Sequence, residues 1–230
     1  MSGAPSRIRF EDVHLAYGER SVLRGVTADL TERRIGIIGE NGSGKSTLAR
    51  TINHLVAPTS GRVLIDETDV ATDPKGARRR VGFLFPDASA QIVMPTVRED
   101  LAFSLRGLGL SEEEKTARVD AALVSQGLES HADHPCHLLS SGQQQQLALA
   151  AVLLVDPQIV VADEPTTLLD LRNLRAARAR FAALTQQLVL VTHHLDVLSD
   201  FDRVLLIAEG VVAADGAPAE VIAHYERAMA

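Results

Sequence analysis

The chain has 230 residues, of which 46% are hydrophobic and 23% charged, and its formal net charge is −7. This length is sufficient for a substantial globular core, and an acidic chain is a poor binder of the nucleic-acid backbone, so we expect no nucleic-acid partner. No segment approaches about eighteen uncharged apolar residues, and residues 1–7 lack the apolar core of a signal peptide. We therefore expect a cytoplasmic chain whose membrane contacts are made through partners.

The first thirty residues predict two strands. Apolar and polar residues alternate over 7–16 and again over 21–30, which favours an antiparallel β edge. From Arg33 onward, apolar strand-like runs alternate with helical segments, which predicts a three-layer α/β core.

The pattern between residues 86 and 155 is mainly helical. Capping-box signatures at 96–99 and 111–114 open two predicted helices, and Gly127 ends the second. We therefore expect a single domain of residues 1–230, in which a helical subdomain of about 86–155 is inserted into the α/β core.

The segment 39–47 matches the pattern G-x-x-x-x-G-K-[ST] and stands between the apolar run 35–38 and a helical run. Its glycines let backbone N–H groups surround an anion, and the helix that follows adds its dipole. We expect Lys45 to reach the β- and γ-phosphates of ATP, and Ser46 to ligate Mg²⁺. The candidate nucleotide-binding residues of this loop are Gly39, Glu40, Asn41, Gly42, Ser43, Gly44, Lys45, Ser46 and Thr47.

A second candidate phosphate site begins a helix after Leu139. Ser140 and Gln143 fit the S-x-x-Q capping box, and an apolar helical segment follows. A capping box alone is usually structural, but this one presents hydroxyl and N–H groups at a helix N-terminus. Because the first loop already surrounds the phosphates of its own nucleotide, we expect Ser140, Ser141, Gly142 and Gln143 to contact the γ-phosphate held by a second chain.

A buried strand over 159–163 ends in two carboxylates. We expect Asp163 to serve Mg²⁺, and Glu164 to orient and polarise the water that attacks the γ-phosphorus. A further buried strand at 188–192 is followed by His193, which would lie at the same edge of a parallel sheet and contact the γ-phosphate. Together with Lys45, Glu164 and His193 form the candidate catalytic set.

The order of these motifs resembles that of the ATPase subunits of ABC transporters over essentially the whole chain. The resemblance implies that 39–47 is the Walker A loop, 139–143 the ABC signature and 159–164 the Walker B strand. It implies further that Asp170 is the D-loop residue and His193 the switch histidine. The implied fold is a P-loop NTPase, and the implied assembly is a homodimer or heterodimer that closes head to tail on two ATP molecules.

Tyr17, between an alternating strand and a turn, looks like the aromatic residue that stacks on adenine in this family. The alternative is a tyrosine at the edge of the core. The chain has only two tyrosines and no tryptophan, which favours the stacking role.

A narrower resemblance comes from residues 81–97, which are similar to the ATPases of energy-coupling-factor importers. The form Ala-Gln-Ile-Val-Met-Pro-Thr-Val at 90–97 is most similar to the biotin systems. The resemblance implies uptake of a vitamin, biotin being favoured, with a transmembrane coupling subunit and a membrane substrate-binding subunit as partners. A cobalt or nickel importer ATPase is the alternative.

The chain departs from the family pattern at Pro86, Ser141 and Gln146, whereas Gln91 matches a second glutamine that is common in the energy-coupling-factor group. Pro86 stands where the family has glutamine, and proline cannot ligate Mg²⁺. Gln91 either takes over that metal or water contact or shapes the cleft for the transmembrane partner, the second role being favoured. Ser141 replaces a glycine of the signature, and Gln146 replaces a basic residue.

Two other functional classes are disfavoured. A soluble ABC ATPase that acts on DNA or ribosomes would carry coiled-coil insertions, zinc modules or tandem ATPase domains, none of which this sequence has. Another P-loop enzyme, such as a kinase, would not require the signature or the pair of carboxylates at 163–164.

Two polar clusters have simpler interpretations than a binding site. The segment 131–137 contains three histidines and Cys136, but Pro135 interrupts the spacing and a loop before the signature helix accounts for them. The basic run 78–80 with Lys75 is interpreted as a solvated face.

Overall fold

The computed structural model describes residues 4–167 and 171–229, so Asp170 lies outside the described residues. The strands are β1 (Ile8–Tyr17), β2 (Arg20–Leu30), β3 (Arg34–Ile38), β4 (Ser60–Ile65), β5 (Thr68–Asp69), β6 (Val81–Leu84), β7 (Ile159–Asp163), β8 (Gln187–Val191), β9 (Arg203–Ala208) and β10 (Val211–Gly216). The helices are α1 (Lys45–Thr51), α2 (Pro74–Arg80), α3 (Val97–Ser104), α4 (Glu112–Gln126), α5 (Ser141–Leu154), α6 (Leu171–Ala183) and α7 (Pro218–Met229). Short 3₁₀ turns are η1 (Glu129–His131), η2 (Cys136–Leu138) and η3 (Leu195–Leu198).

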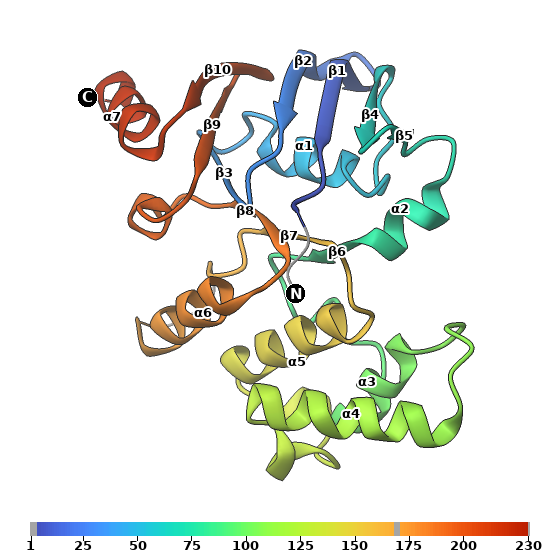
Figure 1. The fold of residues 1–230 in the computed structure, drawn as a ribbon. Coiled ribbons are helices and arrows are strands. Elements are labelled where there is room, and N and C mark those ends of the chain that lie inside the picture. The colour runs from blue at the N-terminus through green and yellow to red at the C-terminus, as the bar shows by residue number, and fades with distance from the viewer. Residues whose placement is uncertain (1–3, 168–170, 230) are drawn as a thin grey trace.

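Two sheets form the α/β core (Figure 1). The antiparallel sheet has the order β2-β1-β4-β5, and its first two strands lie within one residue of the predicted bounds. The second sheet has the order β10-β9-β3-β8-β7-β6, in which all neighbours except β10 and β9 are parallel. The loops after β3, β7 and β8 therefore leave the same edge of this sheet.

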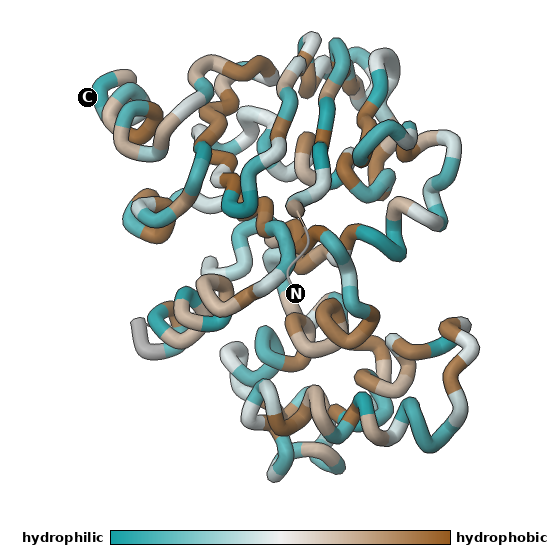
Figure 2. Tube along the Cα trace, viewed as in Figure 1, coloured by the Kyte–Doolittle hydropathy of each residue, from teal (hydrophilic) through white to brown (hydrophobic). Residues whose placement is uncertain are grey.

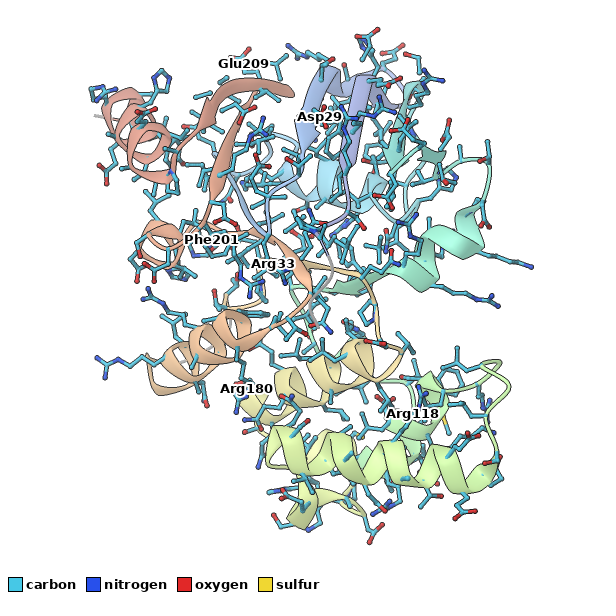
Figure 3. The ribbon with its side chains drawn as sticks, viewed as in Figure 1. Asp29, Arg33, Arg118, Arg180, Phe201 and Glu209 are labelled. Carbon is cyan, nitrogen blue, oxygen red and sulfur yellow. The ribbon has the colours of Figure 1, made fainter. Side chains whose placement is uncertain are left out.

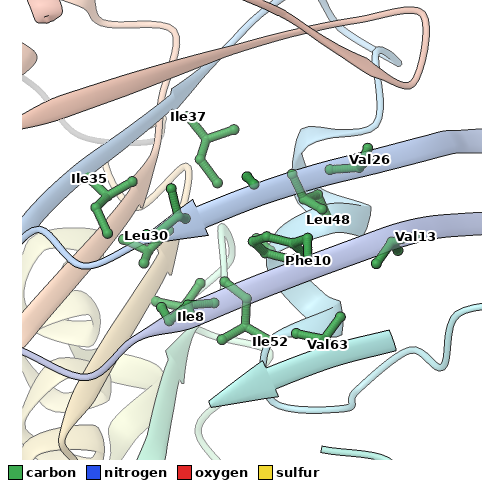
Figure 4. Packing of buried hydrophobic residues seen from close by; sticks show 14 of the residues in the cluster. Ile8, Phe10, Val13, Val26, Leu30, Ile35, Ile37, Leu48, Ile52 and Val63 are labelled. Carbon is green, nitrogen blue, oxygen red and sulfur yellow. The ribbon is translucent and has the colours of Figure 1, made fainter. Parts of the chain in front are cut away.

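The predicted layers are confirmed by the packing. Apolar side chains of the antiparallel sheet and α1 meet one face of the parallel sheet, as Figure 4 shows for Phe10, Leu48, Ile35 and Ile37. The opposite face is covered by side chains of α5, α6, η3 and α7. Asp29, labelled in Figure 3, lies at the end of β2. It accepts a hydrogen bond of 2.8 Å from Arg7, which ties the N-terminal segment to the sheet.

Helices α3, α4 and α5 gather on one side of the molecule around their own apolar cluster (Figure 1). The predicted capping boxes at Thr96, Ser111 and Ser140 are present, and Gly127 ends α4 in the left-handed conformation. Helix α5 also packs on the parallel sheet through Ala148 and Leu149, so it belongs to both apolar clusters.

The basic run 78–80 lies on α2, which Figure 2 shows as a largely hydrophilic segment at the edge of the core. Arg78 and Arg79 are exposed, whereas Arg80 pairs with Asp66.

Candidate functional site

The segment 39–47 joins β3 to α1 in a conformation that requires glycine. Gly39 has a φ of 142°, and a Cβ atom there would lie 2.0 Å from the carbonyl oxygen of Ile207 on β9. Gly44 precedes α1 with a φ of 108°. Ser43 is buried, and among the described residues its hydroxyl has no hydrogen-bond partner. A buried, unpartnered hydroxyl beside backbone N–H groups is the donor arrangement that suits a phosphate.

The loop is fastened to the two sheets through Gly210, in the turn between β9 and β10. The N–H of Gly210 donates to the carbonyl of Ser43 at 3.0 Å, and its own carbonyl accepts from the N–H of Arg24 at 2.9 Å. A Cβ atom at Gly210 would lie 2.3 Å from the carbonyl oxygen of Val22 on β2. The β9–β10 turn therefore makes direct backbone contact with both the segment 39–47, here called the phosphate loop, and the antiparallel sheet.

Lys45 is held inside the loop rather than in solvent. Its ammonium donates to the carbonyl oxygens of Gly39 at 2.8 Å and Glu40 at 2.7 Å. Burial lowers the pKa of Lys45, while the carboxylates of Glu164, Asp163 and Glu40 oppose this shift. The side chain is thus a buried cation beside the concavity of the loop, as phosphate binding requires.

Asp163, at the end of β7, meets the segment 39–47 and the helix α1 that follows it. The hydroxyl of Ser46 donates to Oδ1 of Asp163 at 2.6 Å, and Arg50 donates to Oδ2 at 3.1 Å. Asp163 is fully buried, so these bonds offset the cost of burying its charge. A hydroxyl and a carboxylate side by side are the hard oxygen ligands that Mg²⁺ prefers, so these two residues fit that ion.

Glu164 turns away from β7 toward the end of β8. Its φ of 47° lies in the left-handed region, which is uncommon for a residue with a side chain, and its N–H donates to Val191 at 2.9 Å. Its carboxylate lies 2.7 Å from Nδ1 of His193. The register that pairs Asp163 with Val191 brings these two side chains together, as expected for residues that follow neighbouring parallel strands.

An open cavity of about 340 Å³ lies between the loop and the antiparallel sheet. Tyr17 is 54% exposed at the end of β1, which argues against a core-edge role and suits stacking. The lining residues are Tyr17, Arg20, Val22, Asn41, Gly42, Gly44, Lys45, Ser46, Thr47 and Glu164.

Sequence reasoning missed two basic residues of this site. Arg50 stands four residues after Ser46, so one helical turn places both on the same face of α1, and that spacing was an available signal. Arg20 lines the cavity at the start of β2, three residues after Tyr17. The position of Arg20 depends on the turn between the two strands, and no sequence motif pointed to it.

The signature residues do not line this cavity. Ser140 caps α5: its hydroxyl accepts from the N–H of Gln143 at 3.3 Å, and its N–H donates to Oε1 of Gln143 at 2.9 Å. Ser141 is exposed in the first turn, whereas Gly142 is buried, and a Cβ atom there would lie 2.7 Å from the amide of Asn173 on α6. Within one chain the signature and the phosphate loop are thus parts of separate surfaces.

Gln91 uses both of its amide groups on the backbone at the end of β6. Its Oε1 accepts from the N–H of Phe85 at 3.2 Å, and its Nε2 donates to the carbonyl of Phe83 at 3.3 Å. Neither Gln91 nor Pro86 lines the cavity around Lys45. Pro86 instead lines a small cleft with Ser141 and Pro165.

A larger surface cavity of about 450 Å³ lies between the segment after Gln91 and the turn before the signature. It is lined mainly by the apolar stretch Ile92–Pro95 together with Ser89, Cys136, His137 and Gln144. Val93 is 61% exposed. Cys136 is almost fully buried, and burial raises the pKa of its thiol to about 11.

Comparisons with known proteins extend this picture. A family model described as ABC transporter matches residues 23–167. The biotin transport ATP-binding protein BioM of Rhodobacter capsulatus is 46% identical over 208 residues, which are 90% of this chain and 89% of that protein. The energy-coupling factor transporter ATP-binding protein EcfA1 of Caldanaerobacter subterraneus subsp. tengcongensis is 37% identical over 232 residues, covering 95% of this chain and 83% of that protein.

A solved structure is also similar to this fold. The structure of cbiO1 from Clostridium perfringens, described as part of the ABC transporter complex cbiONQ, matches with a TM-score of 0.84 and 31% identity. The match covers 96% of this chain and 92% of that chain. In the described part of the present chain, no helix is long and apolar enough to cross a membrane.

Proposed function

Because this chain belongs to the ABC transporter family of ATP-binding, ATP-hydrolysing subunits, we propose that it powers an energy-coupling-factor importer of a vitamin. The observation that carries the ATPase role is the meeting of Lys45, Ser46, Asp163 and Glu164 at one edge of the parallel sheet. The names of the relatives and the sequence of residues 81–97 support the importer class.

The residues of the site divide the chemistry between them. Gly39 to Thr47 hold the phosphates with backbone N–H groups, and Tyr17 stacks on the base. Ser46 and Asp163 hold Mg²⁺, which supplies charge neutralisation at the phosphate oxygens.

Glu164 and His193 act on the water and on the γ-phosphate. The carboxylate of Glu164 lines the cavity and orients the attacking water. His193, whose Nδ1 donates to Glu164, contacts the γ-phosphate. Lys45 stabilises the charge that develops on the transferred phosphoryl group.

The site is completed by a second ATPase chain in a homodimer or heterodimer. Ser140, Ser141, Gly142 and Gln143 lie outside the cavity of their own chain, which supports a role toward the nucleotide of the other chain. The hydroxyl of Ser140 accepts a hydrogen bond within the cap, so its proton is available for a phosphate oxygen. The D-loop role of Asp170 belongs to this same interface.

Membrane contact is made through a transmembrane coupling subunit and a membrane substrate-binding subunit, with this chain peripheral on the cytoplasmic face. The apolar cavity at Ile92–Pro95 supports a docking position for the coupling subunit. Gln91 shapes this position by fixing the start of the segment to β6. We place the inserted helical subdomain at about 86–155 of the single domain 1–230, so that the docking segment and the signature belong to one unit.

Biotin is the favoured substrate, and cobalt or nickel is the alternative. The test is to tag this chain, solubilise native membranes gently and identify the co-purifying proteins by mass spectrometry, followed by binding of labelled biotin, cobalt or nickel to the recovered complex. Recovery of two membrane subunits with biotin binding supports the proposal. Recovery of soluble or nucleic-acid-bound partners alone contradicts it.

A further inference from the structure

The signature helix makes a contact that its capping box does not require. The amide nitrogen of Gln143 lies 2.8 Å from Nε2 of His131, a residue of η1 twelve positions earlier in the chain. On its other side, Nδ1 of His131 lies 3.1 Å from the hydroxyl of Ser130. The ring also contacts that of His134 edge-on, with centroids 5.0 Å apart.

The hydrogen-bond directions in this chain of contacts are fixed by the cap. Oε1 of Gln143 already accepts from the N–H of Ser140, so the group that faces His131 is the amide NH₂, which can only donate. Nε2 of His131 must then be the acceptor. Its ring proton is on Nδ1 and is donated to Ser130.

From this geometry we infer that His131 is a positioning residue: it orients the signature residues Gln143 and Ser140, which are proposed to contact the nucleotide held by the second chain. By accepting from the amide of Gln143, the ring holds that amide with its oxygen on the N–H of Ser140. The same Gln143 backbone N–H bonds the Ser140 hydroxyl, so the orientation of the donor proposed for the γ-phosphate depends on this pair. The inference rests on the proposed shared site.

Removal of the acceptor releases the amide of Gln143 to rotate, because the NH₂ then has only solvent as a partner. The cap of α5 can still form, since Ser140 and Gln143 remain. Without His131, the cap no longer has a single orientation before the second chain binds. The cost of ordering the Gln143 side chain is then added to the free energy of dimer formation.

The test uses the full chain with Glu164→Gln as the parent, and measures by light scattering the ATP concentration that gives half-maximal dimer with Mg²⁺. His131→Leu should raise this concentration about three- to tenfold, the effect of one lost hydrogen bond. His131→Gln, whose amide oxygen is again an acceptor, should restore the parent value. His224→Leu, the same substitution at an exposed histidine of α7, is the matched control and should leave it unchanged.

A second measurement addresses the contact directly. Nitrogen–proton correlation spectra of the ¹⁵N-histidine-labelled chain should show His131 neutral with its proton on Nδ1. A proton on Nε2 overturns the inference, and so does an unchanged midpoint for His131→Leu or equal impairment by His131→Gln. If the Glu164→Gln parent itself stays monomeric, the proposed shared site is wrong, and the inference about His131 is wrong with it. If the parent dimerises, a negative result with the His131 variants contradicts only the inference about His131.

Discussion

Ser46 and Asp163 are 117 residues apart in the sequence, yet the hydroxyl of one donates to the carboxylate of the other at 2.6 Å. The two residues expected to serve Mg²⁺ are therefore already adjacent, with Asp163 oriented on its other side by Arg50. If these two residues hold Mg²⁺, the Ser46 hydroxyl would have to turn its proton away from Asp163, while the two side chains would already be side by side.

Asp163→Asn should lower ATP hydrolysis by about a hundredfold or more, because the amide removes the charge that we propose serves Mg²⁺. The measurement is the initial rate at saturating ATP across a Mg²⁺ titration. Asp156→Asn, an exposed aspartate before β7, is the control and should retain the parent rate. Equal rates for both variants would remove Asp163 from the metal site.

Glu164→Gln should hydrolyse ATP at least about a hundredfold more slowly and accumulate as an ATP-bound dimer, because binding remains while water activation is lost. Sizing chromatography with ATP and Mg²⁺ reports the dimer. Glu209→Gln changes an exposed glutamate and should behave as the parent. A Glu164→Gln chain that elutes as a monomer argues against a site shared between two copies.

Ser140→Ala and Ser111→Ala form a matched pair, since each removes the hydroxyl of a capping box. Both should destabilise the chain by about 1 kcal/mol in urea unfolding. Only Ser140→Ala should also raise the ATP concentration needed for dimer formation, because its hydroxyl is the one proposed to meet the phosphate. An identical dimerisation midpoint for the two variants would reduce the signature serine to a cap.

Gly39→Ala should destabilise the chain by about 2 kcal/mol or more, because its Cβ would overlap the carbonyl oxygen of Ile207. Gly107→Ala is the control: that glycine also has a positive φ, of 77°, but no atom lies within 4 Å of the added Cβ. Urea unfolding monitored by circular dichroism separates steric overlap from backbone strain alone. Similar losses of unfolding free energy in both variants would show that the overlap with Ile207 on β9 is relieved by a small rearrangement that costs little.

Lys45 should make the stability of the free chain rise with pH on the alkaline side. Its folded pKa is lowered by burial, so the cost of burying the ammonium is fully present below that pKa. As the pH rises through the folded pKa, the folded chain loses the proton while the unfolded chain keeps it, which favours folding. The unfolding free energy of the parent should therefore rise relative to that of Lys45→Met as the pH increases over this window. The difference should become constant above the ordinary lysine pKa. A pH-independent difference would contradict the shift.

Local patterns were sufficient to predict most of the fold. Alternation located β1 and β2 to within one residue, and the capping boxes at Thr96, Ser111 and Ser140 mark the observed helix starts, because a helix cap is determined by residues three positions apart. The meeting of Glu164 with His193 followed from the shared edge of parallel strands.

Contacts between distant segments were beyond these patterns. The bond from Gln143 to His131 and the position of Arg20 depend on how loops fold over their neighbours, which no short-range period encodes. Gln91 is ambiguous in sequence because an amide can serve a metal, a water or a backbone, and in the structure its amide is bonded to Phe83 and Phe85.

The hydrogen bonds through Gly210 connect the antiparallel sheet, which carries Tyr17, to the loop 39–47, which carries Lys45. We therefore expect Tyr17 and Lys45 to keep the same spacing whether or not a second chain is present. We expect a single chain to seat the base and first two phosphates of ADP and ATP alike. We expect ATP to be distinguished from ADP by the groups proposed to contact the γ-phosphate, which are Glu164, His193 and the signature of the second chain. Exchange of nucleotide and closure of the dimer would then be separate events.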